Sequence, residues 1–117
     1  MEELSLYFNP RCSKCRTAHG LLAERGIEVQ IVEYLKVAPT VPELRALMVQ
    51  LHTTDPRDMM RTGEDVYAAL GLADESGDAL LEAIAANPIL LERPIFVRDG
   101  HAVIARPPER LLDLLDP

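Results

Sequence analysis

Short apolar runs alternate with stretches of helical periodicity along this chain, and together they predict an α/β fold. The first run, residues 4–8, is rich in strand-forming residues and ends at an Asn-Pro turn pair. From about Ser13 to Arg25 the apolar positions recur with helical spacing, and Gly26 stands where a helix would stop. A second strand is expected over residues 28–34. The two strands should therefore pair in parallel across a right-handed helical crossover.

The middle of the chain shows helical patterns only. Thr40 and Glu43 have the spacing of a capping box, which predicts a helix from about Val41 to Leu51. Shorter helical segments should follow at about residues 56–60, 64–70 and 77–86. We therefore expect a helical insertion over about residues 40–88, placed between the two halves of a sheet.

An Asp-Gly pair at residues 99–100, between two apolar runs, predicts a β-hairpin. A two-residue loop would place Phe96 opposite Val103 and, counting outward, Arg93 opposite Arg106. Two prolines after the hairpin should open a last, leucine-rich helix that ends at the final proline. The complete pattern predicts a mixed sheet of about four strands flanked by helices.

Length and charge narrow the class of protein. A chain of 117 residues suffices for one domain with one core, so residues 1–117 are expected to form a single domain. The formal charge of −7 disfavours direct binding to nucleic acid. Because no apolar stretch approaches the roughly 20 residues that a membrane span needs, we expect a cytoplasmic protein that contacts no membrane.

The candidate chemistry begins at the two cysteines, Cys12 and Cys15, where the first strand should give way to a helix. A thiol at a helix N-terminus is stabilised as the thiolate by the helix dipole and by unpaired backbone N–H groups. Arg11, Lys14 and Arg16 add positive charge nearby. Cys15, one turn further on, could attack a bond formed at Cys12 and release it as an intramolecular disulfide.

Two other interpretations of the cysteine pair are open. It could be half of a zinc site, but zinc needs further ligands, and the three histidines have no recognised spacing with the pair. It could also be two inert core thiols, although a strand-turn-helix junction is a poor place to bury them. We therefore expect no metal, and interpret the histidines as solvated or capping groups; they are His19, His52 and His101.

Arg93 and Arg106 raise a separate question, because like charges placed directly opposite each other destabilise a sheet. An anion held between two guanidinium groups is the simplest compensation. Ion pairing to Glu92 and Glu109, or simple solvation, is the alternative. The Arg93–Pro94 bond, directly before a strand, could be cis, and the sequence leaves its isomer open.

Five short motifs together resemble the glutaredoxin-coupled arsenate reductases, or ArsC family, over nearly the whole chain. They are Tyr7-Phe8-Asn9-Pro10-Arg11-Cys12, Met60-Arg61, Asn87-Pro88-Ile89-Leu90, Arg93-Pro94-Ile95 and Arg106-Pro107-Pro108-Glu109. The resemblance implies a thioredoxin-like (glutaredoxin-like) fold with an inserted helical region, and it implies an oxidoreductase that detoxifies arsenic.

The same resemblance implies roles for individual residues. Cys12 would attack arsenate, and Arg61, Arg93 and Arg106 would hold the oxyanion. Arsenate would be reduced to arsenite with electrons from glutathione and glutaredoxin, without a bound cofactor. Because many members of the family lack a second cysteine, Cys15 suggests that this protein can resolve its own intermediate, and that thioredoxin could also be its electron donor.

One departure from the family and two alternatives remain. Well-studied members often carry a histidine where this chain has Phe8, which leaves Lys14, Arg61 and the helix end to keep Cys12 ionised. The protein could instead be a general thiol-disulfide oxidoreductase. It could also be an Spx-type redox-sensing regulator that binds RNA polymerase, although a redox switch has no need of three oxyanion-binding arginines.

Overall fold

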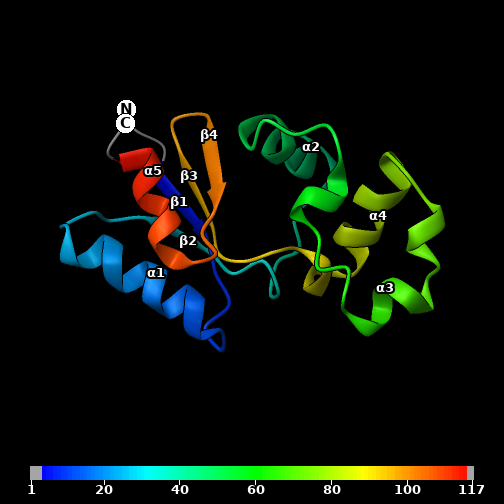
Figure 1. Cartoon of the computed structure of the whole chain (residues 1–117), viewed down its shortest axis with the longest axis horizontal. Helices are drawn as coiled ribbons and strands as arrows, with labels where there is room; N and C mark the ends of the chain where they lie inside the picture. Colours follow the sequence, from blue (N-terminus) through cyan, green and yellow to red (C-terminus); the bar gives the residue numbers. More distant parts are fainter. Residues whose placement is uncertain (1–3, 116–117) are drawn as a thin grey trace. The chain divides into compact units, whose positions relative to one another are not determined.

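The computed structural model describes residues 4–115, and the chain divides into two compact units. One, here the α/β unit, is the chain up to Tyr34 together with the chain from Arg93 onward. The other, the helical unit, is Leu35–Glu92. Every strand drawn in Figure 1 belongs to the α/β unit.

The α/β unit is built on a four-stranded sheet with the strand order β2-β1-β3-β4. The strands are β1 (Leu4–Tyr7), β2 (Gln30–Val32), β3 (Ile95–Arg98) and β4 (His101–Ile104). β1 pairs in parallel with β2 and antiparallel with β3, and β3 pairs antiparallel with β4. The predicted mixed sheet of about four strands is therefore confirmed. β2 is shorter than expected at both ends, and at its C-terminal end the N–H of Tyr34 donates to the carbonyl of Val32 and turns the chain out of the sheet.

The hairpin between β3 and β4 has the predicted register, with Phe96 opposite Val103. Asp99 and Gly100 form its two-residue loop with φ values of 49° and 83°. A loop of this kind requires positive φ at both positions, and Asp-Gly is among the pairs that tolerate it best. The two-residue loop therefore fixes which residues of β3 and β4 lie opposite each other.

Helix α1 (Ser13–Glu24) and the C-terminal segments cover the sheet from the same side (Figure 1). Gly26 follows α1 with φ 71°, as expected for the residue that stops a helix. The last helix differs from the prediction, because a 3-10 turn, η4 (Pro108–Leu111), precedes a short α5 (Leu112–Leu115); the expected end at Pro117 lies outside the described residues. The buried core of the unit consists of Leu6, Ala18, Leu22, Phe96, Val103, Ala105 and Leu111.

The helical unit contains α2 (Val41–Gln50), η1 (Pro56–Met59), α3 (Asp65–Ala69), η2 (Leu72–Asp74), α4 (Asp78–Ala86) and η3 (Pro88–Leu90). The capping box that opens α2 is present, since Thr40 and Glu43 exchange side-chain and backbone hydrogen bonds. Its helices therefore follow the sequence pattern, except that η2 and η3 were not predicted. Segments of three residues are too short to show a period.

Arg57 connects η1 to the segments after it within the helical unit. Its Nε donates to the hydroxyl of Tyr67 at 2.9 Å. Its Nη2 donates to the carbonyl oxygens of Leu72 at 2.8 Å, Ala73 at 3.2 Å and Glu75 at 2.5 Å. This guanidinium therefore holds four acceptors from α3, η2 and the chain that follows.

Within residues 4–115, the structure has no helix of the length and apolar character that crossing a membrane demands.

Candidate active site

A tight turn after β1 places Cys12 at the opening of α1. The side-chain oxygen of Asn9 accepts the N–H of Arg11 at 3.0 Å, and the carbonyl of Asn9 accepts the N–H of Cys12 at 2.9 Å. Cys12 itself has extended backbone angles, φ −90° and ψ 120°, and is the N-cap residue of α1. Its sulfur therefore lies at the end of the helix where backbone N–H groups have no helical acceptor.

The surroundings of Cys12 favour its thiolate. Its side chain is 9% exposed, and this burial raises the pKa of the thiol. Burial is outweighed by the backbone N–H and the thiol of Cys15, by the charge of Arg93 and by the backbone N–H of Lys14, so the pKa of Cys12 is lowered. Arg93 is thus the side chain whose charge supports the thiolate, a role that the sequence analysis gave to Lys14 and Arg61.

Cys15 has the opposite character. It lies one turn into α1 and is completely buried, and its burial raises the pKa of its thiol to about 12. The hydrogen bond with the Asn9 backbone opposes burial and lowers this pKa, the hydrogen bond and the charge of Cys12 raise it, and the charge of Arg93 has the smallest effect and lowers it. Neither cysteine is in a disulfide. At neutral pH, Cys15 is therefore a protonated thiol that donates toward the sulfur of Cys12.

Arg93 begins the second half of the α/β unit, and two of its three guanidinium nitrogens are buried and unpaired. Among the residues that the structure describes, Nε and Nη1 of Arg93 have no hydrogen-bond partner. Buried polar groups nearly always have one, and leaving a charged donor without an acceptor is costly. Its charge also acts on both cysteine sulfurs. Arg93 is therefore the candidate anion-binding group of this site.

Arg106 lies beside Arg93, as the hairpin register predicted. The N–H of Ala105 donates to the carbonyl of Pro94 at 2.9 Å, which extends the β3–β4 pairing toward the arginines. Nη1 of Arg106 donates to the carbonyl of Arg93 at 2.9 Å. The peptide bonds that follow both arginines, Arg93–Pro94 and Arg106–Pro107, are cis. The α/β unit thus brings together Cys12, Cys15, Arg93 and Arg106.

Arg61 belongs to the helical unit, where it is held by two carboxylates. Its Nη1 lies 3.0 Å from Glu64 and its Nε lies 3.9 Å from Glu92, and all three side chains are about a quarter exposed. The backbone N–H of Arg61 donates to the carbonyl of Leu90 at 2.7 Å, beside an isolated antiparallel bridge between residues 60 and 91. The position of Arg61 is therefore fixed by local pairing within its own unit.

The remaining features to consider at this site are possible metal ligands, His19 and Asn9. In the described part of the chain, no group of three or more histidine, cysteine or acidic side chains could hold a metal ion. His19 is exposed, and its ring packs edge-on against Phe8 with 5.8 Å between ring centroids. The turn that the Asn-Pro pair predicted is present, and the hydrogen bonds that Asn9 accepts shape it before Cys12.

A four-stranded mixed sheet with a cysteine at the opening of its first helix defines a protein of thioredoxin-like fold. The chain belongs to the ArsC family, which it matches over residues 7–114.

Several relatives are similar over nearly their full length. An arsenate reductase of Neisseria meningitidis is 45% identical over 113 residues, which cover 95% of this chain and 97% of the relative. A solved structure, "Putative arsenate reductase from Yersinia pestis", has a TM-score of 0.91 and 47% identity, and the match covers 95% of this chain and 99% of that one. The structure of an arsenate reductase from Vibrio cholerae has a TM-score of 0.92 and 44% identity, with coverage of 95% and 96%.

Proposed function

We propose that this protein is an arsenate reductase in which Cys12 is the nucleophile and Arg93 and Arg106 bind the oxyanion. The observation that carries the proposal is the pair of buried, unpartnered nitrogens on Arg93, whose charge also acts on the Cys12 sulfur. A tetrahedral oxyanion offers acceptors for such donors. The arsenate reductases among the relatives support the same substrate. Arg61 is proposed as a third oxyanion ligand on the family resemblance.

In the first step, the Cys12 thiolate attacks arsenic(V). A sulfur–arsenic bond forms, and one arsenic–oxygen bond breaks to release that oxygen as water after protonation. The lowered pKa of Cys12 supplies the thiolate, and the arginine side chains neutralise the charge on the remaining oxygens. Arsenic keeps its oxidation state in this step.

In the second step, a thiol attacks the Cys12 sulfur. A disulfide forms, and the electron pair of the sulfur–arsenic bond stays on arsenic, which leaves as arsenite. Cys15 is a poor nucleophile at first, because it is buried with a pKa of about 12. Once Cys12 is bonded to arsenic, however, the Cys12 charge and hydrogen bond that raise this pKa are lost. Burial, the largest cause of the raised pKa, remains, so the adduct removes part of the barrier that keeps Cys15 from acting as the resolving thiol.

Glutathione with glutaredoxin, or thioredoxin, is proposed as the source of electrons. An external thiol would attack Cys12 directly, whereas thioredoxin would reduce a Cys12–Cys15 disulfide. The two routes predict different covalent states of the protein, a mixed disulfide or an internal one.

We further propose that the helical unit is an insertion in one cytoplasmic domain.

The proposal is tested by arsenite formation in the presence of each reducing system. We expect arsenate-dependent oxidation of NADPH and accumulation of arsenite with at least one of the two systems, and neither with Cys12→Ser. No arsenite above background with either system would contradict the proposal.

A general thiol-disulfide oxidoreductase is the second candidate, favoured by the opposite pKa shifts of the two cysteines. It predicts reduction of a disulfide substrate that survives Arg93→Gln and Arg106→Gln. Arsenate reduction should collapse in the same two variants.

A further inference from the structure

Three basic side chains close to Cys12 have no part in the site described so far. They are Arg11, Lys14 and Arg16, and no aspartate or glutamate occurs in residues 4–23. The whole chain, by contrast, has a formal charge of −7. Positive charge is therefore concentrated around the reactive thiol of an otherwise acidic protein.

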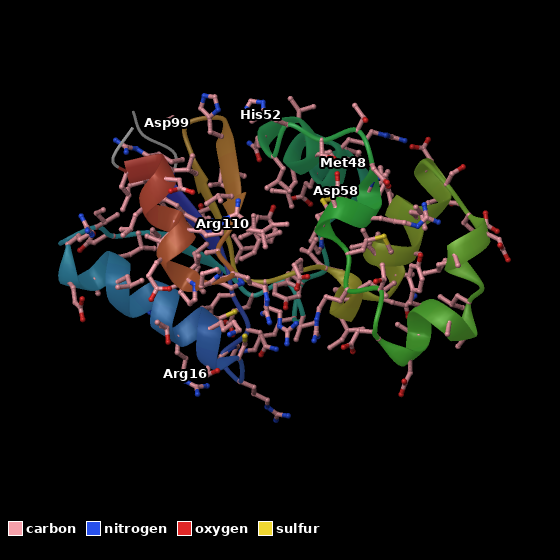
Figure 2. The ribbon with its side chains drawn as sticks, viewed as in Figure 1. Arg16, Met48, His52, Asp58, Asp99 and Arg110 are labelled. Atoms are coloured by element: carbon pink, nitrogen blue, oxygen red, sulfur yellow. The ribbon has the colours of Figure 1, made fainter. Side chains whose placement is uncertain are left out.

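The structure leaves all three side chains exposed to solvent. The position of Arg16 is the best defined, because its Nη1 donates to the carbonyl of Pro10 at 2.9 Å, in the turn that precedes Cys12. Figure 2 shows Arg16 at the end of α1 where the helix begins. Cys12 keeps 9% of its surface exposed on the same first turn. The three basic residues thus belong to the turn before Cys12 and to the first turn of α1.

These charges serve neither of the roles assigned so far. The side chain whose charge lowers the pKa of Cys12 is Arg93, and the proposed oxyanion ligands are Arg61, Arg93 and Arg106. An exposed cluster of one sign beside a reactive group raises the local concentration of reactants of the opposite sign. The second reactant of the proposed cycle is a thiol that must reach Cys12 from solvent.

We propose that Arg11, Lys14 and Arg16 form a docking surface for a small thiol that carries negative charge, the reductant that attacks the bond formed at Cys12. The inference rests on the thiol-dependent second step of the proposed function. Carboxylates of a peptide thiol fit these side chains, since guanidinium groups bind carboxylates through paired hydrogen bonds.

The test uses thiol-disulfide exchange and needs no arsenic. In a Cys15→Ser background, the Cys12 thiolate attacks a symmetrical disulfide, forms a mixed disulfide and expels one thiolate. The reverse reaction is attack by the released thiolate on the mixed disulfide through the same transition state, so the rate constants report how the surface affects an anionic thiol that approaches or leaves beside Cys12. Rate constants are measured by intact mass for oxidised glutathione, which is anionic, 2-hydroxyethyl disulfide, which is neutral, and cystamine, which is cationic.

Arg11→Gln, Lys14→Gln and Arg16→Gln are compared with a matched control, Arg25→Gln. Arg25 follows the other end of α1, about 20 Å along the helix axis from Cys12 and so beyond a Debye length of about 8–10 Å. We expect each of the three variants to lower the ratio of anionic to neutral rate constants about two- to fivefold at low salt. The cystamine rate should rise, Arg25→Gln should change nothing, and the differences should vanish near about 1 M salt.

Three results would overturn the proposal. The ratio could stay at the wild-type value in all three variants. All three disulfides could slow equally, which would mean that the side chains act on the reactivity of Cys12. Only exchange with thioredoxin or glutaredoxin could slow, which would mean that the surface binds a protein partner and not a small thiol. A charge-dependent ratio in a protein that forms no arsenite would refute the proposed function and leave the docking surface established.

Discussion

Arg57 in the helical unit and Arg93 in the α/β unit show two contrasting environments for the same side chain. Arg57 donates to a hydroxyl and three backbone carbonyls, so its hydrogen-bonding capacity is used inside the protein. Arg93 has two buried nitrogens with no partner among the described residues. A guanidinium with internal acceptors stabilises the fold, whereas a buried one without them is suited to bind a ligand.

Arg61 lies between these extremes. It has two internal carboxylate partners, but the side chains are partly exposed, and exposed ion pairs contribute little stability. A ligand could therefore displace Glu64 and Glu92 at modest cost. The contrast separates Arg93, whose buried nitrogens lack internal partners, from Arg57, which has four acceptors, and the role proposed for Arg61 requires it to exchange a carboxylate partner for the oxyanion.

The largest effect is expected for Arg93→Gln. We expect kcat/KM for arsenate to fall about 100- to 1,000-fold, because a donor that meets the charge of the transition state is lost. Arg110→Gln, which removes an exposed arginine of η4, is the control and should be neutral. Steady-state kinetics with the purified variants measures kcat/KM for both. If Arg93→Gln retained activity within threefold of wild type, an unpaired buried guanidinium would no longer identify the binding group.

Replacing Cys15 tests whether its thiol lowers the pKa of Cys12. Cys15→Ala removes the donor that lies beside Cys12, so the pKa of Cys12 should rise, while Cys15→Ser retains a hydroxyl donor and should raise it less. The measurement is the rate of Cys12 alkylation against pH. In the alanine variant the curve should shift to higher pH, so that less thiolate is present at pH 7. A curve for the alanine variant that superimposes on the wild-type curve would show that the thiol of Cys15 donates nothing to Cys12.

Arg57→Gln tests whether a guanidinium that has internal acceptors stabilises the fold. The loss of its contacts to α3 and η2 should lower the melting temperature while leaving kcat/KM of the folded enzyme close to wild type. Arg45→Gln, which breaks an exposed ion pair with Asp78, is the matched control and should have little effect. Thermal unfolding followed by circular dichroism provides the measurement, and equal melting temperatures for both variants would refute the assignment.

The smallest effect is expected at Arg61. Glu64→Gln removes a competing carboxylate, so oxyanion affinity should increase, by about two- to fivefold for one partly exposed ion pair. Calorimetric titration of the Cys12→Ser protein with arsenate would measure it, with Glu82→Gln on α4 as a control of equal charge change. Weaker binding would mean that Glu64 holds Arg61 in its binding position.

Elements with local determinants could be predicted from the sequence. The Asp99–Gly100 loop fixed the hairpin register and, through it, the neighbourhood of Arg93 and Arg106. The capping box at Thr40 predicted the start of α2. The 3-10 helices η2 and η3 were missed because three residues carry no period, and the last helix was expected as one piece because η4 is equally too short to be distinguished from α5.

The positions of the candidate residues in the fold could be predicted better than their environment. The positions of Cys12 and Cys15 followed from the strand-turn-helix pattern. The pairing of Arg61 with Glu92 depends on a bridge between residues 60 and 91, and a contact over such a separation leaves no local pattern. The unpartnered nitrogens of Arg93 likewise result from tertiary burial, which one sequence does not reveal.

The most direct test of the account is the alkylation rate of Cys12 against pH, with and without arsenate, in the wild type and in Arg93→Gln. The lowered pKa of Cys12 predicts a half-maximal rate below the usual thiol range, saturable protection by arsenate, and loss of that protection in the variant. A rate that rises only in the usual thiol range, and that arsenate does not change, would contradict a thiolate poised beside an anion-binding guanidinium.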